Sequence, residues 1–151
     1  MTMHIISPEF AEGGDIPSKF TCDGEDKAPP LHWDGVPGGA RSLALIVDDP
    51  DARNTWVHWL VYNLPPSVEG LPGGIKGGKI PAGARVGIND WRRVDWGGPC
   101  PPSGRHRYFF KLYALDTELP DLGRVSRDDV VRAMRGHVLA EASLMGGYRH
   151  H

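Results

Sequence analysis

The chain has little cysteine, little net charge and no long apolar run. Its two cysteines, Cys22 and Cys100, lack CxxC spacing, so they predict neither a zinc site nor a redox motif, and two free thiols are the default in a cytosolic protein. A formal net charge of −2 gives no basic patch for nucleic acid or for stable membrane association. No run reaches the roughly 18 apolar residues of a transmembrane helix, and residues 1–10 lack the pattern of a secretory signal. We therefore expect a cytoplasmic protein.

Glycine and proline are abundant instead, with 20 glycines and 14 prolines among 151 residues. Because they do not form tandem repeats and apolar runs lie between them, the pattern favours many short strands joined by turns over long helices. The length suits a single domain with its own core. We predict a mostly β fold over residues 1–149 and leave out His150 and His151, which resemble the remnant of a purification tag.

Three long apolar segments predict the main strands, at residues 42–48, 56–64 and 105–115. The first is apolar on both faces, which is typical of a central strand that is covered on both sides. Side chains alternate between the two faces of a strand, so on each of the other two strands a histidine and a tyrosine share one face. On the second strand this face holds Trp56, His58, Leu60 and Tyr62. On the third it holds His106, Tyr108, Phe110 and Leu112.

Shorter strands are expected at residues 4–6, 19–21, 31–33 and 85–88, with a further strand at 138–148. Ser126 followed by Asp129 resembles a helix start, and predicts a helix of about nine residues that ends before Gly136. Residues 65–104 are the least regular part of the chain, and connections of this length are usually functional loops or contain unrecognised elements.

Residues 73–79 match the GxxxxGK pattern of a phosphate-binding P-loop in all but its last position. That position requires a serine or threonine hydroxyl, and the chain has Ile80 there. Pro81 and Gly83 then disfavour the helix that the mechanism needs. We expect a solvated basic turn.

A candidate site emerges where the three main strands would meet. Asp49 follows the central strand, His58 lies on the second, and His106 and Tyr108 point to one side of the third. If the strands are neighbours, these side chains converge at one edge of the sheet. Imidazole N–H, tyrosine O–H and loop N–H groups are donors, which favours an oxyanion ligand. Taken singly, each histidine also fits a purely structural role, and the combination of four is what indicates a site.

The surroundings of this site are also suggested by the sequence. The loop with Cys100, Pro101 and Pro102 would form a rim, and Trp56 an apolar wall. Asp49 could orient a histidine or accept from a donor of the ligand, such as a protonated phosphate oxygen or an ammonium group. Asp51 fits either a ligand contact or an ordinary turn. Arg107 and His137 are expected to be structural.

Several motifs resemble the phosphatidylethanolamine-binding protein family, and most closely its bacterial and archaeal Raf kinase inhibitor-like branch. They are DDPDA at 48–52, HWLVYN at 58–63, GPCPPSGRHRYFFKLYAL at 98–115 and GHVLAEASL at 136–144. The resemblance covers nearly the whole chain. It implies a Greek-key β-sandwich with one or two short peripheral helices and an anion-binding pocket at one end.

The family's pocket motifs fall here on Asp49, His58, His106 and Tyr108, with Trp56 lining the pocket and residues 100–102 edging it. Two positions depart from the pattern, since Arg53 stands where proline is common and Trp96 where tyrosine is usual. The family makes a homodimer plausible and suggests inhibition of a kinase or protease as the output.

Three functions compete on this basis. The first is a binding module for a small phosphorylated or carboxylated ligand, with no metal and no cofactor. The second is a hydrolase or other enzyme that uses Asp49, His58 and His106 as a metal triad, or one histidine as a general base. Cys100 could be a nucleophile, although its place between prolines suits a rim better. The third is an interaction protein with a vestigial pocket.

Overall fold

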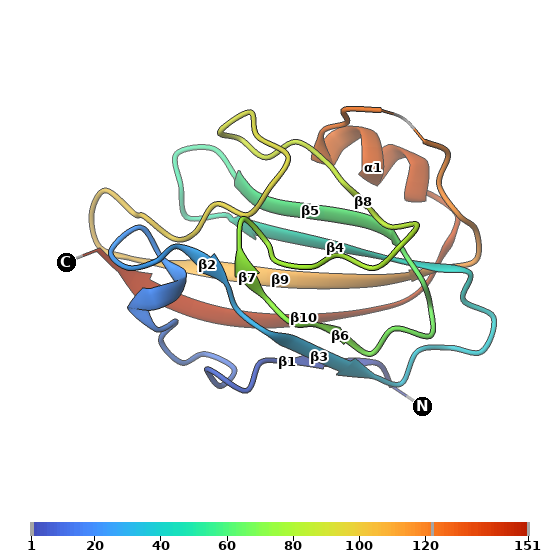
Figure 1. The fold of residues 1–151 in the computed structure, drawn as a ribbon, viewed down its shortest axis with the longest axis horizontal. Helices are drawn as coiled ribbons and strands as arrows, with labels where there is room; N and C mark the ends of the chain where they lie inside the picture. The colour runs from blue at the N-terminus through green and yellow to red at the C-terminus, as the bar shows by residue number, and fades with distance from the viewer. Residues whose placement is uncertain (1, 122, 151) are drawn as a thin grey trace.

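The computed structural model describes residues 2–121 and 123–150, and it is mostly β (Figure 1). The large antiparallel sheet has the order β10 (Val138–Arg149), β9 (Arg105–Leu115), β4 (Ser42–Asp49), β5 (Trp56–Leu64), β8 (Arg85–Val86). A second sheet has the order β1 (His4–Ile6), β3 (Leu31–Asp34), β6 (Gly70–Leu71), and a third pairs β2 (Lys27–Ala28) with β7 (Gly74–Ile75). The described helices are η1 (Ser18–Phe20) and α1 (Arg127–Met134). The predicted β-sandwich is confirmed.

Strand β4 is central because it has no solvent-facing side. All eight of its residues are buried, and it pairs with β5 on one side and with β9 on the other. The chain leaves β5, crosses a long irregular connection, and returns on the far side of β4 as β9. This return, rather than a simple meander, brings the start of β9 beside the end of β4, as the expected Greek-key topology requires.

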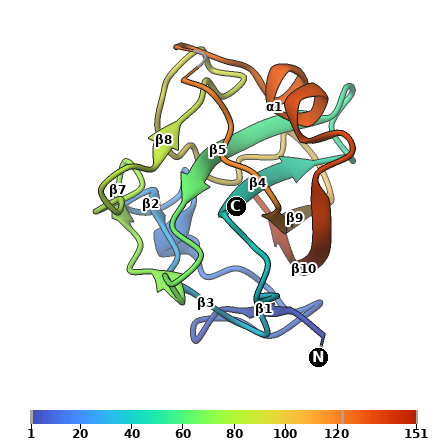
Figure 2. The ribbon, with the colours of Figure 1, turned by 90° about the vertical axis from the view of Figure 1, so that its right-hand side faces the viewer.

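Two apolar cores cover the two faces of the large sheet. The first lies between this sheet and the small ones, and Leu45, Trp59 and Phe110 are among its fully buried members. The second lies under α1, where Val130 and Met134 pack on Ile46 and Leu60. Figure 2 shows the layers edge-on, with α1 on one side of β4 and β5 and with β1 and β3 on the other. Burial on both faces explains why the sequence of β4 is apolar throughout.

Helix α1 begins where the sequence predicted. The Ser126 side chain accepts from the Asp129 backbone N–H, and the Asp129 carboxylate accepts from the Ser126 N–H. This reciprocal capping box satisfies two amide groups that the first helical turn leaves without partners. The helix ends one residue earlier than expected, because Arg135 is already non-helical and Gly136 follows with a φ of 81°.

Strand β5 contains a bulge that the sequence analysis missed. Val47 pairs with Trp59 and Asp48 pairs with Val57, so His58 is an extra residue with no partner on β4. The predicted common face of His58 with Leu60 and Tyr62 is therefore wrong, since those two residues lie in the core under α1. A bulge redirects one side chain without ending the strand, and here it redirects His58.

The remaining differences lie in short elements. Residues 19–21 were expected to form a strand, but the 3-10 turn η1 occupies Ser18–Phe20 and Thr21 caps it. The 65–104 connection contains β6, β7 and β8, of which only β8 was expected. The GxxxxGK segment forms turns in which Gly77 N–H donates to Gly74 O and Gly78 N–H donates to Ile75 O. A turn, and not a P-loop, was expected here. Within the described residues, no helix has the length and apolar character needed to cross a membrane.

Candidate functional site

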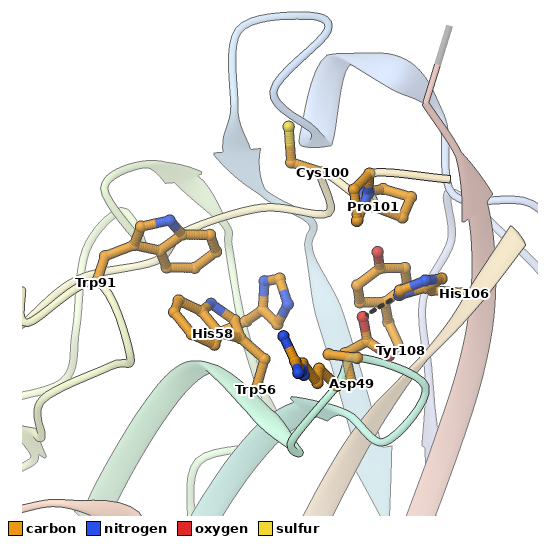
Figure 3. Close-up of a pocket in the computed structure, with 11 residues that line it drawn as sticks. Asp49, Trp56, His58, Trp91, Cys100, Pro101, His106 and Tyr108 are labelled. Atoms are coloured by element: carbon orange, nitrogen blue, oxygen red, sulfur yellow. Dashed lines mark hydrogen bonds and ion pairs between the residues drawn. The ribbon is translucent and has the colours of Figure 1, made fainter. Parts of the chain in front are cut away.

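A pocket of about 360 Å³ opens at the edge of the large sheet where β4 ends and β9 begins (Figure 3). It is lined by Asp49, Ala52, Arg53, Trp56, His58, Trp91, Cys100, Pro101, Pro102, His106 and Tyr108. Eight of the nine residues that the sequence proposed therefore meet in one place. Strand adjacency causes the meeting, because the antiparallel pairing of β4 with both neighbours places its last residue beside the first residues of β5 and β9.

Asp49 and His106 form a hydrogen-bonded pair within the pocket. The Nδ1 atom of His106 lies 2.6 Å from Oδ2 of Asp49, and the other carboxylate oxygen accepts from the backbone N–H of Asp51 at 2.8 Å. Both side chains are largely shielded from solvent. Because the carboxylate holds the proton on Nδ1, the Nε2 atom of His106 is the one left for a ligand. Asp49 is thus an orienting group.

His58 is held in the neutral form with a fixed tautomer. It is buried, and its Nδ1–H donates to the carbonyl of Gly97 across 2.7 Å. Burial lowers the pKa of His58 to about 4, although the bond to Gly97 and the charge of Asp49 oppose this change. With Nδ1 donating and the ring uncharged, Nε2 of His58 is an acceptor. The expectation that both histidines donate to a ligand is therefore wrong for His58, which offers an acceptor.

Tyr108 supplies a hydroxyl that stays protonated. Burial and the negative charges of Asp49 and Asp51 raise the pKa of this phenol above its ordinary value. Its ring packs edge-on against His58, with centroids 5.1 Å apart. The pocket therefore combines a hydroxyl, the Nε2 of an oriented imidazole and an acceptor imidazole. Such a mixed set is complementary to an anion that still carries one proton, such as a monoprotonated phosphoryl group.

The rim formed by residues 100–102 is fastened by a disulfide bond. Cys22 and Cys100 are bonded, with their Cα atoms 5.5 Å apart, which corrects the expectation of two free thiols. The reason is a crossing of two loops, because Cys22 N–H donates to Pro99 O and Gly98 N–H donates to the Asp26 carboxylate. The cysteines are 78 positions apart, so no local sequence motif could predict the bond.

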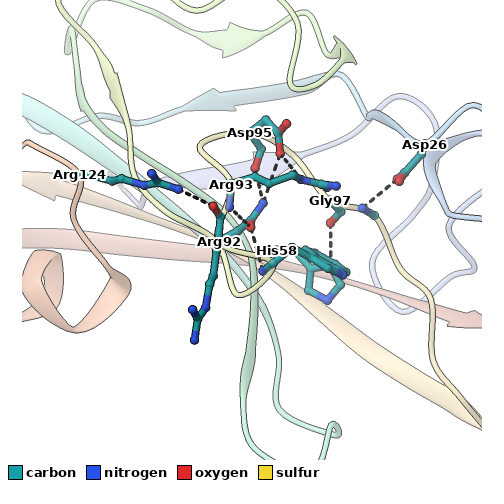
Figure 4. A network of polar contacts seen from close by, with 10 residues as sticks. Asp26, His58, Arg92, Arg93, Asp95, Gly97 and Arg124 are labelled. Atoms are coloured by element: carbon teal, nitrogen blue, oxygen red, sulfur yellow. Dashed lines mark hydrogen bonds and ion pairs between the residues drawn. The ribbon is translucent and has the colours of Figure 1, made fainter.

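Trp91 is a pocket wall that the sequence analysis did not identify. The Asn89 side chain accepts from the backbone N–H groups of Trp91 and Arg93, and so organises the turn that carries the indole. The Trp91 ring packs edge-on against Trp56 and His58, at 5.6 and 4.9 Å between centroids. Figure 4 shows this loop between its anchors, with Gly97 bonded to His58 and the next residue bonded to Asp26. The abundance of tryptophan in an irregular stretch was the signal available.

Asp51 is the proposed residue that the structure does not bring to the pocket wall. Its carboxylate accepts two bonds from the Arg107 guanidinium and one from the Arg107 backbone, each at 2.9 Å. This pairing lowers the pKa of Asp51 to about 2. Asp51 and Arg107 thus fasten the β4–β5 turn to β9. His137, also expected to be structural, pairs with Asp116 at 2.7 Å.

A metal triad would need three ligand atoms that lie close together. Within residues 2–121 and 123–150, the three metal-capable side chains whose ligand atoms cluster are Cys22, Cys100 and His150. Both sulfurs of this group are joined to each other. The ligand atoms of Asp49, His58 and His106 do not all lie close enough to one another to form such a group among the described residues, although Asp49 and His106 are hydrogen-bonded.

This fold and pocket define a β-sandwich with a candidate anion site at the edge of its main sheet. The family model for phosphatidylethanolamine-binding protein matches residues 6–149, and the chain belongs to this family. It is 53% identical over 149 residues to the UPF0098 protein of Methanothermobacter thermautotrophicus, covering 97% of this chain and 99% of that protein. It is 44% identical over 153 residues to the UPF0098 protein of Aquifex aeolicus, covering 97% and 88%.

Solved structures agree with this assignment. The crystal structure of a putative phosphatidylethanolamine-binding protein homolog, CT736 from Chlamydia trachomatis, is similar with a TM-score of 0.93 and 41% identity, covering 99% of both chains. E. coli YBCL, described as a new member of the mammalian PEBP family, is similar with a TM-score of 0.91 and 34% identity, also covering 99% of both chains.

Proposed function

We propose that this protein is a binding module for a small anion, with a phosphoryl or carboxylate group held between His106, Tyr108 and His58. The observation that carries the proposal is the Asp49–His106 pair, which leaves Nε2 of an oriented imidazole for the ligand inside a largely apolar pocket. A carboxylate that fixes a tautomer is a common device for presenting the second nitrogen. The phosphorylated ligands to test first are inorganic phosphate and O-phosphoethanolamine.

The proposed binding mode follows from the protonation states. Tyr108 O–H and, when the ring is protonated, His106 Nε2–H donate to anionic oxygens of the ligand. His58 accepts the remaining proton of a monoprotonated phosphoryl group at Nε2. Charge-assisted bonds to an oxyanion are shorter and stronger than neutral ones, and they gain further strength where water is excluded. The walls formed by Trp56, Trp91, Pro101 and Pro102 supply that exclusion.

Calorimetric titration with inorganic phosphate tests the proposal. We expect millimolar or tighter binding to the unaltered protein and loss of binding in His106→Ala, with the strand signal in circular dichroism unchanged. His137→Ala is the matched control, because His137 also pairs with a carboxylate but lies outside the pocket. Equal phosphate affinity in both variants, or no affinity of the unaltered protein for phosphate, O-phosphoethanolamine or acetate, would contradict the proposal.

We propose binding without turnover. The candidate nucleophile Cys100 is in a disulfide, and both oxygens of Asp49 are engaged. A general base needs a free acceptor within reach of the proton it removes, and His58 is the group that could supply one. Sustained release of product from p-nitrophenyl phosphate that disappears in His58→Gln would favour the hydrolase instead.

Regulation of a kinase or protease, and a homodimeric assembly, remain proposals that rest on the family. Light scattering coupled to gel filtration tests the dimer.

The cytoplasmic location is also a proposal, and it requires the disulfide to persist in, or be absent from, a reducing compartment. Reducing thiol pools keep most cytosolic cysteines as thiols, except in disulfide-rich hyperthermophiles. Alkylation of acid-quenched cells would show whether Cys22 and Cys100 are oxidised in place.

A further inference from the structure

Arg53 is an exposed cation in the wall of the pocket. Some arginines near the pocket have acidic partners, as with Arg107 and Asp51. Arg93 likewise pairs with Asp95 at 3.0 Å. Arg53 lines the pocket, is exposed, and has no hydrogen-bond or ion-pair partner among the residues that the structure describes. An unpaired guanidinium that faces a binding cavity is free to pair with a ligand, and its planar fork suits carboxylate and phosphate.

The cavity is larger than a phosphate ion. Its volume of about 360 Å³ equals roughly a dozen water-sized groups at about 30 Å³ each. The part not needed for the phosphoryl group is lined by Ala52, Trp56, Trp91 and the rim prolines. Figure 3 shows Trp56 and Trp91 on the side away from His106. The pocket therefore has room for a short organic spacer beyond the phosphoryl group.

The charges around this space disfavour an ammonium group at the far end of that spacer. Arg53 is itself a cation, and the Arg93 guanidinium already lies over the Trp91 ring, 5.6 Å from its centroid. Figure 4 shows Arg93 held in this loop by Asp95. The acidic residue in the pocket wall, Asp49, is committed to His106 and to the β4–β5 turn. A second cation would meet repulsion from Arg53, and the described pocket lining has no carboxylate besides Asp49 to offset it.

We infer that the pocket selects phosphomonoesters whose organic part carries a second anionic group, and that Arg53 is the residue that recognises this group. The inference deepens the proposed anion-binding function and rests on it. Different residues would bind the two groups of the ligand. The phosphoryl group would contact His106, Tyr108 and His58, and the second anionic group would contact Arg53. A carboxylate a few bonds from the phosphate ester is the simplest ligand of this class.

Two commercial compounds test the inference because they differ by a single carboxylate. O-phosphoserine has the phosphate and ammonium groups of O-phosphoethanolamine together with a carboxylate. We expect O-phosphoserine to bind the unaltered protein about threefold to tenfold more tightly at low salt, a modest factor because Arg53 is exposed. Calorimetry on the full chain gives both dissociation constants under identical conditions.

Variants assign the difference to Arg53. In Arg53→Gln the ratio of the two dissociation constants should fall to about one, and Arg53→Lys should restore part of it. Arg135→Gln removes the same charge from an exposed position after α1, away from the pocket, and should leave the ratio unchanged. Equal affinities in the unaltered protein, or a ratio that survives Arg53→Gln, would overturn the inference and leave anion binding intact. Failure of both compounds and of inorganic phosphate to bind would overturn the proposed function as well.

Discussion

The Nδ1–H group of His58 donates to the carbonyl oxygen of Gly97 across 2.7 Å, and the bulge in β5 makes this bond possible. His58 has no partner on β4, so its side chain points toward the 97–104 loop instead of the core under α1. The bond joins a strand to a loop that is 39 positions away in the chain. The bond also fixes the tautomer of the ring, with the proton on Nδ1 and Nε2 left as an acceptor.

Protein stability should fall as the pH decreases from 6.5 toward 4. Unfolded His58 gains a proton near its ordinary pKa of 6.5, whereas the folded ring resists protonation until about pH 4. The unfolded state therefore binds more protons in this window, and the free energy of unfolding decreases by up to about 3 kcal/mol. Above pH 6.5 this group contributes no pH dependence. Urea unfolding between pH 4 and 7.5 measures the slope.

The same titration identifies the group responsible. His58→Gln should flatten the slope in this window, and His137→Gln at the surface should leave it as it is. An unchanged slope in His58→Gln would show that other groups cause the acid sensitivity.

Replacing Asp49 by Asn should weaken phosphate binding by about tenfold or more. An amide cannot hold the proton on Nδ1 of His106 as a carboxylate does, so the ring loses its fixed tautomer. Titration calorimetry gives the affinity, and ¹⁵N NMR of the imidazole reports the tautomer. Asp116→Asn alters the equivalent pair with His137, 2.7 Å apart at the surface, and should leave phosphate affinity unaffected. Similar losses in both variants would argue against an orienting role for Asp49.

Removing the disulfide should cost about 2–4 kcal/mol of unfolding free energy, because the bond closes a long loop in the unfolded chain. The double variant Cys22→Ser with Cys100→Ser should also bind phosphate more weakly, since the rim then depends on hydrogen bonds such as Cys22 N–H to Pro99 O. Chemical denaturation with and without a reductant measures the first effect. Reductant should not affect the double variant, and a loss of stability there would mean that reduction acts elsewhere.

Lys111→Met should destabilise the fold by about 2–4 kcal/mol. The Asp48 carboxylate is fully buried, with Lys111 Nζ at 3.1 Å and Arg127 Nε at 3.7 Å, so losing Lys111 leaves a buried charge poorly compensated. Lys19→Met, which breaks an exposed pair with Glu9, should cost under about 1 kcal/mol. Thermal and urea unfolding provide the comparison. Equal costs would mean that Asp48 has another partner or reaches solvent when Lys111 is removed.

The long strands could be predicted from the sequence because their apolar periodicity extends over many residues. Strands β5 and β9 begin and end where the pattern predicted, and β4 extends one residue further, to Asp49 itself. The meeting of Asp49, His58, His106 and Tyr108 in one pocket followed from placing those strands side by side. Strands such as β2 and β7 are two residues long, and such short pairings are set by tertiary contacts rather than by local pattern.

The features that were missed depend on geometry between distant segments. The disulfide depends on two loops crossing, and the acceptor state of His58 depends on a bulge and on the Gly97 carbonyl. Alternation fails at a bulge, so it assigned His58 to the face of Leu60 and Tyr62. In the sequence, Arg53 stood out only as a departure from the family pattern, because its position in the pocket wall, with no acidic partner among residues 2–121 and 123–150, depends on the folded structure.

The pocket walls come from three strands and two loops that are far apart in the chain, so no fragment of the unfolded polypeptide can reproduce them. Any occupant must therefore bind the folded form almost exclusively and raise its melting temperature. An occupant at one hundred times its dissociation constant adds about 2.7 kcal/mol to the unfolding free energy. A thermal-shift survey of phosphorylated metabolites is consequently a direct route to the physiological ligand.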